Sequence, residues 1–149
     1  MSLHNIIPSS TPIPVSGIPS EIKLCVVGAA GAGFASPAQD WQEHAVNLVE
    51  LLRLDRAASF VFRVGGQSMV EAGVFDSDVL VVDRDAKPVN GRIVIAVVDG
   101  GFVVRQLRIR EGMPFLEARN SQMRYEPVIA DEQVEVWGVV RASVRNLLD

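Results

Sequence analysis

The sequence has few of the residues that build metal centres and disulfides. Among its 149 residues are one cysteine, Cys25, and two histidines, His4 and His44. A lone cysteine excludes an internal disulfide and a cysteine-rich zinc site, and two scattered histidines exclude a histidine-based metal centre. The low cysteine content is also typical of a reducing compartment. We therefore expect a cytoplasmic protein with no metal ion and no cofactor.

Long apolar segments and an excess of positive charge are also missing. No apolar run reaches the roughly 20 residues of a membrane-spanning helix, and the N-terminus lacks the pattern of a signal peptide. The formal net charge is −4, which disfavours a basic surface over the whole molecule. We expect no membrane association and no direct DNA binding. Four arginines could still form either a local basic patch or a solvated face: Arg108, Arg110, Arg119 and Arg124.

The chain does contain enough apolar residues for one folded domain. Apolar residues make up 48% and charged residues 21% of the sequence, as in ordinary globular proteins. Residues 1–35 differ from the rest, because they are rich in proline and include the small-residue segment 28–33. Proline removes backbone donors and favours extended neighbours. We expect residues 1–35 to form an extended arm, either docked or disordered, and residues 36–149 to form the domain.

A helix is predicted over residues 36–54. Ser36 is a suitable N-cap, Pro37 fits the first helical position, and Gln39 completes a capping box. Apolar residues then recur on one helical face: Trp41, Ala45, Leu48 and Leu52.

The remainder of the sequence predicts β-strands. The expected strands are residues 60–64, 78–83, 92–98, 102–110, 113–118 and 134–144. The continuous apolar run at 92–98 is typical of a strand covered on both faces, and Asp99-Gly100 is a strong hairpin turn. We predict a mostly-β fold with one short helix and a curled or two-layer sheet.

Two positions depart from their local pattern. Ser68 follows Gly65 and Gly66, which permit a sharp turn at the end of a strand. Such a serine is either an exposed nucleophile with backbone donors beside it, or the cap of a helical turn at Met69–Ala72.

Arg105 is the second position. By strand alternation, one face of residues 102–110 carries Val103, Leu107 and Ile109 together with Arg105 and is expected to face the core. The other face is expected to be solvated; it carries Val104, Gln106, Arg108 and Arg110. A buried guanidinium is costly unless it is paired. Arg105 therefore either extends its charged end to water or has a function.

Three blocks of sequence, in order over about residues 32–146, resemble the UmuD/LexA family of self-cleaving serine peptidases. The first is the segment 32–38, Ala-Gly-Phe-Ala-Ser-Pro-Ala, which is similar to the cleavage-site region of that family. The second is 66–69, Gly-Gln-Ser-Met, followed by Gly73 and the strand 78–83, which is similar to the nucleophile block. The third is the hairpin 91–105, which in that family carries the catalytic lysine.

The resemblance implies a LexA/UmuD-like peptidase domain and a specific reaction. Ser68 would be the nucleophile, the backbone amide of Met69 would contribute to the oxyanion site, and the cut would fall between Ala32 and Gly33. A RecA filament on single-stranded DNA would stimulate this cleavage. The shortened chain would form a homodimer and join the subunit of an error-prone translesion DNA polymerase. The short arm, without a helix-turn-helix pattern, places the chain with the UmuD-like members.

One residue departs strongly from the family pattern. Arg105 aligns with the lysine that acts as general base, and an arginine keeps its proton at ordinary pH. The two lysines of the chain, Lys23 and Lys87, are poorly placed to substitute. We therefore expect self-cleavage to be absent or very slow. A naturally degenerate member and a deliberate replacement of lysine would both give this sequence.

A different class of function is the alternative. The chain could be a non-catalytic, dimeric interaction module of the polymerase or of the DNA-damage response. In that case the apolar segment 134–144 would be either plain core or an interface strand. A signal peptidase, which has a related Ser/Lys arrangement, is disfavoured because no membrane span is present.

Overall fold

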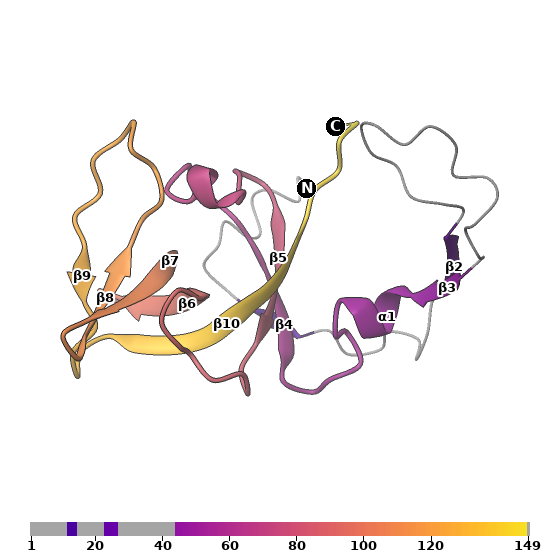
Figure 1. The fold of residues 1–149 in the computed structure, drawn as a ribbon, viewed down its shortest axis with the longest axis horizontal. Coiled ribbons are helices and arrows are strands. Elements are labelled where there is room, and N and C mark those ends of the chain that lie inside the picture. Colours follow the sequence, from indigo (N-terminus) through magenta and orange to yellow (C-terminus); the bar gives the residue numbers. More distant parts are fainter. Residues whose placement is uncertain (1–11, 15–22, 27–43, 149) are drawn as a thin grey trace.

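The fold is dominated by one antiparallel sheet. The computed structural model describes residues 12–14, 23–26 and 44–148. Eight strands pair in the order β1-β4-β5-β10-β6-β7-β8-β9 (Figure 1). Their bounds are β1 Ile13–Pro14, β4 Ser59–Arg63, β5 Val79–Asp83, β6 Ile93–Val98, β7 Gly101–Arg110, β8 Met113–Glu117, β9 Val128–Ile129 and β10 Glu135–Val144. The prediction of a mostly-β fold is confirmed.

The long strand β10 joins the two halves of this sheet. Its first half pairs with β6, from Glu135 opposite Val97 to Val139 opposite Val94. Its second half pairs with β5, from Val139 to Val144, which lies opposite Val79. The register shifts once in each ladder, and such bulges bend a strand and increase its twist. Consequently β1, β4 and β5 form one half of the sheet and β6–β9 the other.

Two apolar clusters lie against the sheet, and β6 contributes to both. Val94 and Ala96 belong to the cluster around Leu107 and Leu116, whereas Ile95 belongs to the cluster around Trp137. The prediction that this strand is covered on both faces is confirmed. Three phenylalanines contact the Trp137 ring edge-on with centroid distances of 5.2–5.7 Å, the geometry that aromatic pairs prefer: Phe60, Phe62 and Phe102.

A small part of the predicted arm pairs with the sheet. In β1, Ile13 lies opposite Val61 and Pro14 opposite Phe60. Strands β2 (Lys23–Val26) and β3 (His44–Asn47) form a separate two-stranded ladder, which Figure 1 shows on the far side of α1 from the main sheet. Ala32 and Gly33 lie outside the described residues.

The helix predicted over residues 36–54 is wrong where the structure describes it. His44–Asn47 is a strand, and helix α1 covers only Leu48–Leu51. Asn47 is the N-cap, and its side chain accepts hydrogen bonds from the Val49 and Glu50 amides at 3.0 and 3.5 Å. Arg53 has a φ of 58°, which ends the helical turn. None of the helices in the described ranges is long and apolar enough to cross a membrane.

The predicted faces of β7 are also partly wrong. Val104 was expected in solvent but is buried with the Trp137 cluster, whereas Ile109 was expected in the core but is 43% exposed. The reason is that β7 lies between the two apolar clusters, because Phe102 and Val104 pack with Trp137 whereas Val103 and Leu107 pack in the other cluster. The middle of β7 therefore has neighbours on both faces, and its end forms a projecting hairpin.

Candidate active site at Ser68

Ser68 lies on the loop between β4 and β5, whose base is closed by backbone hydrogen bonds. The Val64 amide donates to Asp78 O and the Ser77 amide donates to Val64 O, both at 2.8 Å. Gly66 has a φ of +87°, which favours glycine. Its amide donates to Asp76 Oδ1 at 2.7 Å. The turn before Ser68 is therefore held to the far side of its own loop.

The residues after Ser68 form a short helical turn, the 3-10 helix η2 (Val70–Ala72). Met69 O accepts from the Ala72 and Val74 amides, and the Met69 side chain is almost fully buried. Met69 is the N-cap position of this turn, and no side chain caps it. The alternative that Ser68 serves as the cap is therefore wrong. Within the described ranges, the amides of Ser68 and Met69 donate to no acceptor.

The connection between β8 and β9 holds Ser68 from the other half of the sheet. The Arg119 amide donates to Ser68 O, and the Glu71 amide donates to Arg119 O, each at 2.8 Å. The Asn120 side chain also donates to Gln67 O at 2.7 Å. Gln67, Ser68 and Glu71 of the serine loop are thus all hydrogen-bonded to the segment Arg119-Asn120.

Arg105 on β7 reaches Ser68 directly. Its Nη1 donates to Ser68 Oγ at 2.9 Å and to Val104 O at 2.8 Å. The guanidinium carbon lies 5.4 Å from the centre of the Tyr125 ring. Burial lowers the pKa of Arg105, and Tyr125 partly opposes this shift. The two residues singled out from the sequence are therefore brought together, and the charged end of Arg105 turns to Ser68 instead of open solvent.

A pocket of about 270 Å³ lies beside these two residues. Its apolar wall comes from β4 to β7. The lining residues are Phe62, Arg63, Val64, Gly65, Gly66, Gln67, Ser68, Leu80, Ile95, Phe102, Val103, Val104, Arg105 and Tyr125. Two arginines and no carboxylate belong to this set. The pocket is therefore apolar and positively charged, in a chain whose net charge is −4.

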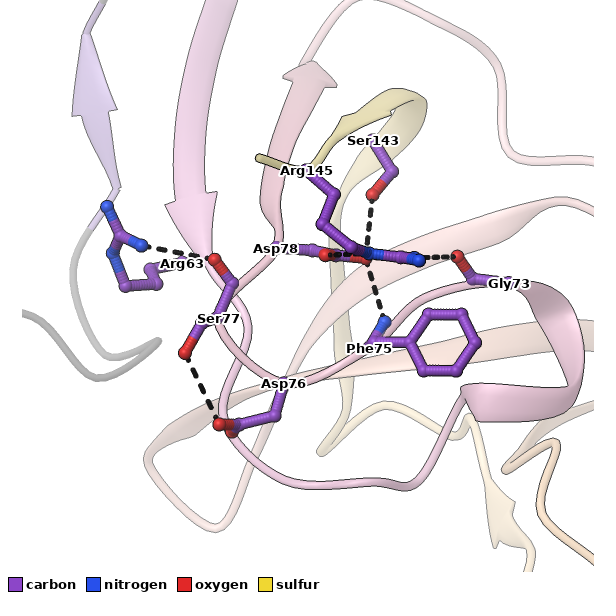
Figure 2. Close-up of polar contacts among 8 residues, drawn as sticks. All are labelled: Arg63, Gly73, Phe75, Asp76, Ser77, Asp78, Ser143 and Arg145. Carbon is purple, nitrogen blue, oxygen red and sulfur yellow. Dashed lines mark hydrogen bonds and ion pairs between the residues drawn. The ribbon is translucent and has the colours of Figure 1, made fainter. Parts of the chain in front are cut away.

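An ion pair between exposed Arg145 and the buried carboxylate of Asp78 supports the end of the serine loop (Figure 2). Asp78 is fully buried, and Arg145 donates to it from Nε at 2.7 Å and from Nη2 at 3.0 Å. Ser143 Oγ and the Phe75 amide donate to the same carboxylate. The bonds from Arg145 are the main cause that lowers the pKa of Asp78. Arg145 also donates to Gly73 O and packs over the Phe75 ring.

Several of these residues were missed by the sequence reasoning. Asp78 comes directly before the buried strand β5 and Asp76 lies two residues earlier, where an acidic residue suggests a partner. Tyr125 is the single tyrosine of the chain. Arg145 gave no signal, because 67 residues separate it from Asp78. Lys87 is exposed and does not line the pocket.

Three of the four arginines that the sequence analysis singled out as a basic patch or a solvated face have side-chain partners. Arg110 pairs with Glu117 and Arg124 pairs with Glu126, while Arg119 donates to the Gln106 side chain at 2.8 Å. No group of three metal-ligating side chains occurs in the described part of the chain.

Comparison with known proteins gives a consistent set of relatives. The chain matches the Peptidase S24-like family model over residues 25–141, a range that includes Ser68 and Arg105. It is 38% identical over 129 residues to Protein ImpA of Salmonella typhimurium, covering 87% of this chain and 88% of that protein. It is 39% identical over 114 residues to Protein MucA of Escherichia coli, with 76% and 77% covered. It is also 33% identical over 140 residues to a LexA repressor of Acidothermus cellulolyticus, covering 94% of this chain and 50% of the repressor.

Proposed function

Because this chain belongs to the Peptidase S24-like family, we propose that it is a self-processing protein of the DNA-damage response whose serine site lacks only its base. Ser68 is the nucleophile, the Met69 amide contributes to the oxyanion site, and the bond between Ala32 and Gly33 is the substrate. Arg105 takes the position of the family's lysine, so self-cleavage is absent or very slow.

One observation carries this proposal, namely the hydrogen bond from Arg105 Nη1 to Ser68 Oγ at 2.9 Å. A general base must lie within hydrogen-bond reach of the hydroxyl and must accept its proton. Arg105 meets the first requirement but not the second, because a guanidinium has donors and no acceptor. Burial lowers the pKa of Arg105, but arginine is not deprotonated in proteins. A lysine here could lose its proton under the same burial.

The biological setting follows from the resemblance. A RecA filament on single-stranded DNA would stimulate cleavage, and the protein would act as a homodimer with the subunit of an error-prone translesion polymerase. The Arg119 amide donates to Ser68 O and the Arg119 carbonyl accepts from the Glu71 amide, which supports a site that is already formed before substrate binds.

The test is self-cleavage of the full chain and of Arg105→Lys, followed by intact-mass spectrometry from about pH 7 to pH 10. We expect only the lysine variant to give fragments that end at Ala32 and begin at Gly33. Its rate should rise with pH as the lysine loses its proton. Activated RecA filament should increase the rate further.

The matched control is the double variant Ser68→Ala with Arg105→Lys, which should remain intact. Cleavage of the unchanged chain at Ala32–Gly33 would show that another base serves Ser68. If Arg105→Lys stays intact with RecA filament at every pH, the proposed site is wrong.

A second candidate is a non-catalytic dimeric module. The predicted interface segment 134–144 is mostly core, since Trp137 and Val139 are buried and Val134, Val136 and Val140 pack against the two clusters. Beyond it, Leu147 and Leu148 are 86% and 96% exposed, together with half-exposed Val144. Sedimentation of Leu147→Ser/Leu148→Ser should show loss of the dimer if this end forms the interface. A monomeric unchanged chain at micromolar concentration would exclude the module.

A further inference from the structure

Arg105 has hydrogen-bond donors that no other group uses. A guanidinium carries five N–H groups in a planar fork. Both bonds of Arg105 come from Nη1, to Ser68 Oγ and to Val104 O. Within residues 12–14, 23–26 and 44–148, Nε and Nη2 have no acceptor, and no carboxylate pairs with this side chain. Arg141 and Arg145, in contrast, each place Nε on a buried aspartate at 2.6 and 2.7 Å.

The unused donors belong to a half-buried cation in a pocket that contains no negative charge. Burying a charge without a partner is unfavourable, and the Arg105 guanidinium has only the Tyr125 ring and two neutral oxygens nearby. The other arginine of the pocket, Arg63, donates to Ser77 O. An anionic group on a ligand would supply the missing counter-charge, and the Nε and Nη2 edge matches the two oxygens of a carboxylate.

The remaining lining fixes the kind of molecule that could carry this anion. Most of the pocket wall is apolar, with Phe62, Leu80, Ile95 and Phe102 as its larger members. The Ser68 hydroxyl and the two unpartnered backbone amides of Ser68 and Met69 can together contact one acyl group, because such amides donate to its oxygen. These features favour an apolar chain that ends in a planar acyl anion over a tetrahedral phosphate.

We propose that this pocket binds the free C-terminal carboxylate of an apolar peptide, with Arg105 as the ligand of the carboxylate. The inference rests on the proposed function in one respect, because it places an acyl carbon beside Ser68. The peptide product of a cut at Ala32 has this chemistry. In this chain, Arg105 would thus turn a cleavage site into a receptor for carboxylate ends.

The test is isothermal titration of the full chain with two acetylated peptides of residues 26–32. One peptide ends in a free carboxylate and the other in a carboxamide. We expect the carboxylate to bind about tenfold tighter or more, because charge-assisted hydrogen bonds are worth that factor. Arg105→Gln should abolish the preference. Arg124→Gln, which changes an exposed arginine that does not line the pocket, should leave it within about twofold.

Several outcomes would overturn the inference. Equal binding of the two peptides, or a preference that survives in Arg105→Gln, would remove Arg105 as the ligand. Acetate binding as tightly as the peptide would indicate a small-anion site only. If Arg105→Gln does not fold, the unchanged chain still decides, since salt should weaken the carboxylate peptide and not the carboxamide.

The outcome separates this inference from the proposed function. If Arg105→Lys cleaves itself but the unchanged chain shows no preference for the carboxylate peptide, the inference is wrong and the proposed function stands. If the unchanged chain prefers the carboxylate peptide but Arg105→Lys does not cleave itself, the proposed reaction is wrong and the carboxylate-binding role of the pocket stands.

Discussion

Arg145 donates two hydrogen bonds to the buried carboxylate of Asp78, across a separation of 67 residues in the sequence. The bond joins the residue that follows strand β10 to the residue that precedes β5. Ser143 and Phe75 complete the ligands of the carboxylate (Figure 2). This pair therefore closes the half of the sheet that carries the Ser68 loop.

Removing Arg145 should cost more stability than neutralising Asp78. Arg145→Leu leaves a buried carboxylate without its cation, and we expect a loss of about 3–5 kcal/mol in the free energy of unfolding. Asp78→Asn keeps the shape and removes charge-assisted bonds, at about 2 kcal/mol. Urea unfolding monitored by circular dichroism measures both. The exposed pair Arg124–Glu126 is the control, and Arg124→Leu should change stability by less than about 1 kcal/mol. Equal effects of Arg124→Leu and Arg145→Leu would contradict this ranking.

Acid should destabilise the protein partly through Asp78. The hydrogen bonds from Arg145 lower its pKa in the folded state, so the folded chain binds fewer protons than the unfolded one near pH 4. The corresponding stability is present above the unfolded pKa, about 3.9, and is lost as pH falls through the lower folded pKa. We expect the stability gap between the unchanged chain and Asp78→Asn to shrink from pH 7 to pH 3 in urea unfolding. A constant gap would argue against this linkage.

Asp76 should act as a positioning residue for Ser68. Its carboxylate holds the Gly66 amide at 2.7 Å, so Asp76→Ala releases the turn before the serine. In the Arg105→Lys background we expect about a tenfold slower self-cleavage, because small misplacements of a reacting group are costly. Hydrogen exchange at the Gly66 amide should also accelerate in the unchanged background.

The matched control for this prediction is Asp131→Ala. Asp131 accepts from the Gln133 amide in a turn away from the pocket. It should leave both the cleavage rate and the Gly66 exchange unchanged. If both aspartate variants slow cleavage alike, the effect is general loss of stability and not positioning.

Gly138 should tolerate no side chain. A Cβ at this position would lie 2.7 Å from Val82 Cγ1 and 3.3 Å from Asp83 O, next to the residue at which β10 begins to pair with β5. We expect Gly138→Ala to cost about 1–3 kcal/mol through overpacking, as measured by urea unfolding. Gly101→Ala is the control, because its Cβ would meet only Val98 O at 3.8 Å. A Gly138→Ala variant as stable as the unchanged chain would show that the strands can separate without cost.

The sequence predicted the long strands well and the short elements poorly. Strands β4 to β8 and β10 are each at least five residues long and rich in apolar residues, and each overlaps a predicted strand. The two-residue strands β1 and β9 contain too few residues for any periodicity. The helix prediction failed at His44–Asn47, where apolar spacing suited a helix but pairing with β2 gives a strand.

The candidate site could be predicted in part, and for a physical reason. The family assignment from the three motif blocks is confirmed, and that alignment brought Ser68 and Arg105 into view together. Their roles stay predictions. The supporting contacts of Asp76, Arg119 and Arg145 depend on loop geometry and on pairing between distant strands, which leave no local pattern. The burial of Val104 likewise depends on the Trp137 cluster that covers its face of β7.

The pairing of β1 with β4 gives the N-terminal residues a second role. Strand β1 pairs with the outer edge of β4, where Ile13 lies opposite Val61 and Pro14 lies opposite Phe60. A chain cut at Ala32 would hold its first piece through this two-residue ladder and through the four-residue ladder between β2 and β3, and pairings this short are marginal by themselves. Departure of that piece would uncover the edge of the strand that leads into the Ser68 loop. An exposed edge strand can pair with a strand of another chain. A single cleavage would therefore create a new surface for strand pairing on the protein.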